Sequence, residues 1–186
     1  MKRCSWVPIL LLTFILLACA LACGKSSSSS TAPAPATAWT DSTSGLTWQV
    51  TPFDSTMDWA DATSYCQNLA LDGGSWRLPS ISELRTLVRG CVETETGGAC
   101  GITDSCLDSS CSNSSCDGCA TGAGPNGGCY APAELANNCC WNWSSSAIAD
   151  DAGSAWYMDF SRGFVDTKSK APSGYGTNFP YVRCVR

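Results

Sequence analysis

The sequence predicts an α+β domain, and three observations lead to this fold class. Two segments carry apolar residues at the three- and four-residue spacing of a helix. Several short segments have the alternation or the aromatic composition of strands. A cysteine-rich stretch interrupts the succession between residues 91 and 140. We expect two helices to pack on a shared sheet, with this stretch as a separate insertion.

The first elements are a strand and a helix. Residues 45–50 alternate apolar and polar side chains, as a half-buried strand does. In residues 56–69, one helical face collects an aromatic residue, a small residue, a cysteine and an aliphatic residue, namely Trp59, Ala62, Cys66 and Leu69. Ser55, Thr56 and Asp58 are all suitable N-caps for this helix.

A second helix is expected to begin at Ser80. Ser80 and Glu83 have the spacing of a capping box, in which each side chain bonds the other residue's backbone N–H. Leu84, Leu87 and Val88 supply the apolar side of this helix.

Residues 91–140 have a different composition. Nine of these 50 residues are cysteine and eight are glycine. Such a segment offers little apolar surface, so its order should come from crosslinks that reduce the entropy of the unfolded chain. We therefore expect a disulfide-stapled insertion that loops out of the domain, with the adjacent Cys139 and Cys140 in two separate crosslinks.

Four strands are expected after the insertion. They comprise residues 141–144, 155–160, 163–167 and 181–186. Ser161 to Gly163 would form a hairpin turn between the second and third of these strands.

An ordered series of six motifs resembles the Lcl C-terminal domain, a family named for a bacterial collagen-like surface adhesin. The motifs are Gly45-Leu46-Thr47-Trp48-Gln49, Trp59-Ala60-Asp61-Ala62 with Tyr65-Cys66, Trp76-Arg77-Leu78-Pro79-Ser80 with Glu83-Leu84, Trp143-Ser144-Ser145-Ser146, Trp156-Tyr157-Met158-Asp159-Phe160 with Gly163, and Tyr181-Val182-Arg183-Cys184-Val185-Arg186. The resemblance covers residues 45–186 apart from the insertion.

The resemblance implies a C-type-lectin-like fold, shared with the sulfatase-modifying factor group. In that fold two helices pack on short, mostly antiparallel strands, and a disulfide joins the first helix to the last strand. Cys66 and Cys184 occupy those positions. The Glu-Pro-Asn, Gln-Pro-Asp and Trp-Asn-Asp tripeptides of calcium-dependent sugar sites are absent, and Trp141-Asn142-Trp143 is only similar to the last of them.

The N-terminal region is typical of a bacterial lipoprotein. Residues 1–22 combine a charged start, an apolar run and small residues before a cysteine, as a secretory signal peptide does. Cys23 would carry the acyl chains, palmitate among them, that anchor the protein in a membrane, and Cys19 is the alternative. An uncleaved transmembrane anchor is a further alternative. Residues 23–38 would form a Ser/Ala/Pro-rich tether, and residues 39–186 the domain.

Composition excludes several classes of function. Without Lys2 and Arg3, 9 basic residues face 16 acidic ones, which argues against a nucleic-acid partner. The absence of histidine excludes Ser-His-Asp and Cys-His catalysis. In an oxidising compartment, most of the 14 cysteines should form disulfides rather than metal sites. Eleven cysteines follow Cys23, so one thiol is free or pairs with another chain, unless Cys19 is acylated and Cys23 joins the count.

Candidate site residues follow from side-chain chemistry. Trp141 and Trp143, on one face of a strand, could stack on sugar rings with Asn142 beside them, although core packing is the alternative. Arg77 and Glu83 could form an acid–base dyad, but structural ion pairs of Arg77, Arg183 and Arg186 are the simpler interpretation. No metal site is expected, with one exception: a calcium ion bound by carboxylates of residues in and after the insertion, namely Asp104, Asp108, Asp117, Asp150 and Asp151.

We expect a lipid-anchored envelope protein, in the outer membrane or at the cell surface. Its lectin-like domain would bind a polysaccharide or another envelope protein and would not be an enzyme. The alternatives are an oxidase related to the formylglycine-generating enzymes, which would need two reactive cysteines, and a purely structural envelope protein.

Overall fold

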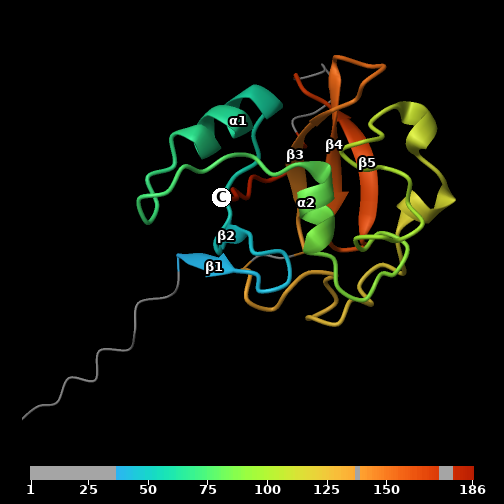
Figure 1. Ribbon diagram of the computed structural model, residues 1–186, viewed down its shortest axis with the longest axis horizontal. Coiled ribbons are helices and arrows are strands. Elements are labelled where there is room, and N and C mark those ends of the chain that lie inside the picture. Colours follow the sequence, from blue (N-terminus) through green and yellow to red (C-terminus); the bar gives the residue numbers. More distant parts are fainter. Residues whose placement is uncertain (1–36, 137–138, 172–177) are drawn as a thin grey trace, which may run out of the picture. The chain divides into compact units, whose positions relative to one another are not determined.

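The computed structural model describes residues 37–136, 139–171 and 178–186. This part of the chain is an α+β domain with two small antiparallel sheets and two helices (Figure 1). The predicted signal peptide, Cys19, Cys23 and nearly all of the predicted tether lie outside the described residues. Within the described part, no helix combines the length and the apolar character that crossing a membrane requires.

The larger sheet comes from the second half of the chain. β3 (Trp141–Ala147), β4 (Ser154–Asp159) and β5 (Phe164–Ser169) pair in that order, all antiparallel. The hairpin expected at residues 161–163 therefore joins β4 to β5, with Asp159 opposite Phe164. The smaller sheet pairs β1 (Ala38–Thr40) with β2 (Thr47–Gln49), so the fold begins just before the predicted boundary at residue 39.

The C-terminal segment does not form the predicted strand. Tyr181 makes a single bridge to Asn142, and Val185 makes single bridges to Trp48 and Arg77. The segment runs between β2 and the chain around Arg77 and exchanges backbone hydrogen bonds with both. Because it divides its donors and acceptors between several partners, it forms no continuous ladder with any of them.

Both helices begin where the sequence predicts. α1 (Trp59–Gln67) is capped by Asp58, whose side chain accepts the Asp61 N–H at 2.9 Å, so Asp58 is the cap among the three suitable residues. α2 (Ile81–Thr86) begins with the complete Ser80–Glu83 capping box. Asp104 of the insertion adds a second contact here, because its carboxylate accepts the Ser80 hydroxyl at 2.6 Å.

The cysteine-rich stretch is part of the core, contrary to the prediction that it loops out. Its largest buried side chains, Ile102, Tyr130 and Leu135, are at most 3% exposed and belong to the same cluster as Trp48 and the apolar side of α2. Three of its half-cystines join them, namely Cys91, Cys100 and Cys116. Most of the few large apolar residues of the stretch thus reach the core, and Val92, at 69% exposed, is the exception.

Two buried arginines hold the irregular backbone. Arg85 is 3% exposed and donates to the carbonyls of Thr94 at 2.9 Å and Ile102 at 2.5 Å. Arg183 is 1% exposed and donates to the carbonyls of Val50 and Ala136, each at 2.6 Å. Buried carbonyls outside regular structure need donors, and a guanidinium supplies five.

Five disulfides crosslink the described residues. Cys66 of α1 is joined to Cys184, at the two positions that the family resemblance implied. The remaining four lie within residues 91–139: Cys91–Cys119, Cys100–Cys116, Cys106–Cys111 and Cys129–Cys139. Cys140 is a free thiol, so the expectation of a crosslink at each of Cys139 and Cys140 is wrong for Cys140.

Candidate functional site

The three residues proposed for ligand binding divide between surface and core. The Trp141 side chain is exposed, whereas Trp143 is fully buried and Asn142 is 1% exposed. Trp143 belongs to the core cluster of Ala62 and Cys66 on α1, and its indole N–H donates to the Met57 carbonyl at 2.9 Å. Asn142 and Trp143 are therefore packing residues, and Trp141 alone is available to a ligand.

Trp141 lies at a hollow of about 430 Å³. The other lining residues include Thr56, Asn178, Phe179 and Tyr181, which bring hydroxyl, amide and aromatic groups. This volume is within the range of about 300–1,000 Å³ that is typical of small-molecule sites. The hollow combines an aromatic surface with hydrogen-bonding groups, as sites for amphipathic ligands do.

The indole of Trp141 is held by its neighbour on β4. Its ring stacks on Tyr157 with centroids 5.3 Å apart and planes at 29°. Burial raises the pKa of Tyr157 well above its usual range, and the nearby carboxylate of Asp166 acts in the same direction. Tyr157 therefore stays neutral, and its hydroxyl donates to Asp166 at 3.3 Å. A ligand would meet an aromatic surface that is already positioned.

The free thiol of Cys140 borders the same hollow. Burial raises its pKa; Arg183 acts against this increase and Asp159 adds to it. The thiol form is thus favoured over the nucleophilic thiolate. Among the described cysteines Cys140 is the single free one, whereas the oxidase alternative requires a pair.

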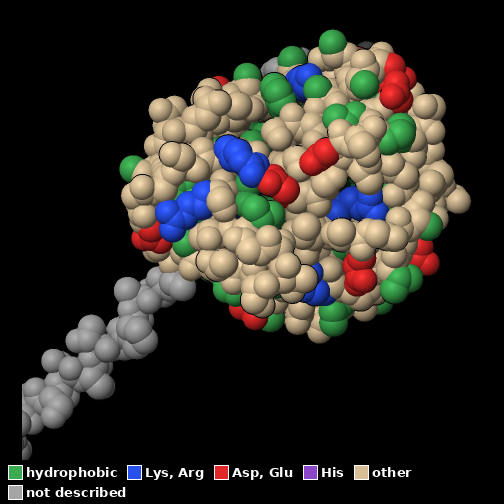
Figure 2. All heavy atoms as spheres, in the orientation of Figure 1, with side chains coloured by type: hydrophobic (Ala, Val, Ile, Leu, Met, Phe, Trp, Pro, Cys, Tyr) green, Lys and Arg blue, Asp and Glu red, His purple; other side chains and the backbone are tan. Residues whose placement is uncertain are grey.

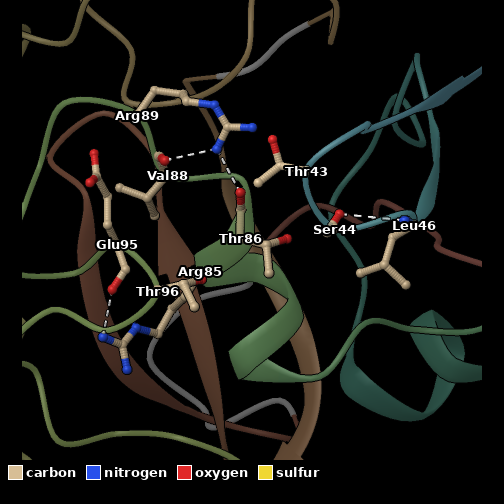
Figure 3. A pocket seen from close by; sticks show the side chains of 9 residues that line it. All are labelled: Thr43, Ser44, Leu46, Arg85, Thr86, Val88, Arg89, Glu95 and Thr96. Atoms are coloured by element: carbon tan, nitrogen blue, oxygen red, sulfur yellow. Dashed lines mark hydrogen bonds between the residues drawn. The ribbon is translucent and has the colours of Figure 1, made fainter.

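A larger hollow, of about 650 Å³, lies between the β1–β2 turn, the end of α2 and the start of the cysteine-rich stretch. Its lining is rich in hydroxyls, from Thr43, Ser44, Thr86 and Thr96. Figure 3 shows the Arg89 side chain reaching across this space, with its guanidinium beside Thr43. Glu95 supplies a carboxylate on the other side.

The guanidinium of Arg89 is fixed by contacts of its two terminal nitrogens. One terminal nitrogen, Nη1, donates to the carbonyls of Thr86 at 2.6 Å and Val88 at 3.0 Å. The other, Nη2, lies 3.6 Å from the carboxylate of Asp41. The side chain is about one-third exposed, at 35%, so part of the guanidinium still faces solvent.

The turn residues keep Asp41 ionised. Burial alone would raise its pKa, but hydrogen bonds from the Thr43 N–H and the Ser44 hydroxyl, together with the charge of Arg89, lower it below the usual value. No motif in the sequence indicates this site. The sequence feature that could have indicated part of it is the turn Asp41-x-x-Ser44-Gly45. The position of Asp41 opposite the end of α2 depends on the fold and cannot be predicted from this turn alone.

The five aspartates considered for calcium do not converge. Asp104 is bonded to the start of α2, and Asp150 accepts the Ser109 N–H at 2.8 Å. Among the described residues, the single group of three metal-type ligands is Cys91, Glu93 and Cys119, and its two cysteines form a disulfide.

Arg77 and Glu83 form a two-pronged ion pair, with contacts of 2.5 and 2.6 Å, as the structural interpretation expected. Glu83 also belongs to the capping box, which gives the pair a structural role. Arg183 and Arg186 make no ion pair within the described residues, contrary to that interpretation. Arg183 bonds carbonyls, and the Arg186 guanidinium lies 5.0 Å over the Trp76 ring.

The model of one protein family, described as the Lcl C-terminal domain, matches residues 37–186 of this chain. The matched range spans the cysteine-rich stretch. No curated protein and no solved structure gives a significant match.

Proposed function

The chain belongs to the Lcl C-terminal domain family, and from this membership we propose that it is a surface binding module of the bacterial cell envelope. The module binds a polysaccharide or another envelope protein. Its fold is of the C-type-lectin-like type. Acyl chains on Cys23, or on Cys19 if cleavage occurs earlier, anchor it to a membrane, with the outer membrane or cell surface as its location.

The observation that carries the binding proposal is the exposed indole of Trp141 at the hollow with Asn178 and Tyr181. Exposed tryptophan is costly in water, and tryptophan is among the residues that contribute most to interfaces. The apolar faces of sugar rings stack on such a surface, while their hydroxyls bond nearby amides and hydroxyls. The crosslinked core keeps this surface in place without a ligand.

Binding is tested with the full-length protein in detergent micelles. The targets are a glycan array and intact cells of a strain that lacks the protein. We expect Trp141→Ala to weaken binding at least about 10-fold, which corresponds to about 1.4 kcal/mol. Val92→Ala is the matched control, because Val92 is the other large apolar side chain exposed in the described part, at 69%. Equal binding by the two variants, or no binding by the unmodified protein, would contradict the proposal.

Anchoring is tested separately, by mass spectrometry of the N-terminal peptide. Removal of residues 1–22 and a diacylglyceryl group on Cys23 are the expected results. An acyl group on Cys19 would favour the alternative cleavage. An intact Met1 without lipid would end the envelope proposal.

A further inference from the structure

The hollow at Arg89 continues into a second one. A neighbouring hollow of about 500 Å³ shares two lining residues with it, Thr43 and Arg89. The second hollow adds an aromatic residue, Trp39, and an exposed carboxylate, Glu134. Because Thr43 and Arg89 line both hollows, we treat the two as adjoining halves of one candidate groove, with Glu95 at one end, Arg89 in the middle and Trp39 at the other end. We call it the Arg89 groove.

The length of the Arg89 groove indicates an extended ligand. The first hollow, at about 650 Å³, and the second, at about 500 Å³, are each as large as a typical small-molecule site. A compact molecule would fill one half and leave Arg89 at its end. A chain would use both halves and pass over the two shared residues.

The lining of the groove favours a polyhydroxyl chain over a peptide. At the Glu95 end four of the nine lining residues carry a hydroxyl, and the hydroxyl of Thr43 makes no hydrogen bond within the described residues. Nη1 of Arg89 holds the side chain in place through its two hydrogen bonds, whereas the Nε–H of Arg89 makes no hydrogen bond within the described residues. These are donors and acceptors for vicinal hydroxyls. Trp39 at the opposite end offers a partly exposed ring for stacking.

The charges that line the Arg89 groove indicate which kind of polyhydroxyl chain it would bind. Among the described residues that line the groove, Arg89 is the one partly exposed cation, since Arg85 is buried and bonded to carbonyls. Against it stand the carboxylates of Asp41, Glu95 and Glu134. Figure 2 shows acidic and basic side chains interspersed on the visible face rather than a broad basic area. An anionic chain would therefore meet net repulsion.

We propose that the Arg89 groove binds a linear, uncharged polysaccharide, with Arg89 and Thr43 contacting the middle of the bound segment. This site is separate from the hollow at Trp141, so it does not depend on the role proposed for that residue.

The test measures binding of defined hexasaccharides to the full-length protein in micelles by calorimetry. The uncharged probes are cellohexaose, maltohexaose, N-acetylchitohexaose and the methyl ester of hexagalacturonate. Hexagalacturonate itself is the anionic counterpart with the same backbone. We expect at least one uncharged probe to bind, and the free acid to bind at least 10-fold more weakly than its ester.

Variants assign the binding to the groove. Arg89→Ala should weaken the affinity for the bound hexasaccharide at least 10-fold. Thr43→Val should weaken this affinity about 3-fold, and because Thr43 is an exposed turn residue, the substitution leaves the ion pair between Asp41 and Arg89 intact. Lys168→Ala removes a positive charge on β5 and serves as a control. Both Lys168→Ala and Trp141→Ala should change the affinity for the hexasaccharide less than 2-fold. Thermal unfolding of each variant verifies folding. Binding of none of the uncharged probes, equal binding of acid and ester, or an unchanged affinity in folded Thr43→Val would overturn the proposal.

Discussion

The disulfide between Cys66 and Cys184 should stabilise the domain more than any other described crosslink. It joins residues 118 positions apart, whereas the next longest spans 28. In the chain-entropy model a loop of that length is worth about 4.8 kcal/mol. The disulfides inside this loop shorten the chain that separates Cys66 from Cys184 in the unfolded state to about 80 residues. Because the stabilisation depends on the logarithm of the loop length, it falls only to about 4.5 kcal/mol.

The matched comparison is the disulfide between Cys106 and Cys111, which closes a loop of only 5 residues. The same model gives it about 2 kcal/mol. Replacing each pair by two alanines should thus lower the free energy of unfolding by amounts that differ by about 2.5 kcal/mol. Alanine is the suitable replacement because Cys66 and Cys184 are fully buried, and serine would bury unpartnered hydroxyls.

Urea unfolding of the full-length protein, followed by tryptophan fluorescence without reductant, measures both losses. Each pair is replaced in a Cys140→Ser background, so that the free thiol cannot exchange with the remaining disulfides. Equal losses for the two pairs would refute the reasoning. They would mean that the unfolded chain is already held compact by the crosslinks of the cysteine-rich stretch, so that the long loop adds no constraint.

Three further outcomes are expected. Arg85→Met should lower the free energy of unfolding by about 3 kcal/mol or more in the same urea assay, because it leaves the buried carbonyls of Thr94 and Ile102 without donors. The thiol of Cys140 should react with Ellman's reagent more slowly than an unfolded cysteine, because burial raises its pKa; equal rates would contradict this. The stability lost in Asp41→Asn should be largest above pH 3.8, should decrease as the pH falls below that value, and should vanish once the pH has fallen through the lower pKa that Asp41 has in the folded protein. The reason is that the lowered pKa of Asp41 favours folding only while the carboxylate is ionised in the native state. A difference that persisted at lower pH would show that the charge is not responsible.

Local signals in the sequence predict the helices and the hairpin well. Asp58 and Ser80 cap the two helices, because caps are decided by residues three positions apart. The turn at residues 161–163 joins β4 to β5 for the same reason. The C-terminal segment was predicted wrongly, because alternation of apolar residues reports burial but does not say how many partners share the backbone bonds.

The candidate sites were predictable only in part. Trp141 and Trp143 lie on one face of β3, as alternation requires. Trp143 is nevertheless buried, because residues from segments that are distant in the sequence pack against it. The Arg89 groove depends entirely on such distant contacts. Asp41, Arg89 and Glu134 are far apart in sequence, and no spacing rule connects them.

Crosslinks and buried arginines solve two different problems of the cysteine-rich stretch. A disulfide reduces the freedom of the unfolded chain, but it gives no donor to a carbonyl that folding removes from water. Arg85 supplies such donors to residues 94–102, and Arg183 supplies them to residue 136 at the other end. Burying a guanidinium is itself costly, and burial lowers the pKa of Arg183 to about 10. The carbonyls offset that cost and keep the arginine charged near neutral pH. A stretch with few apolar residues can therefore share the core, and it brings Glu95 and Glu134 to the two ends of the Arg89 groove.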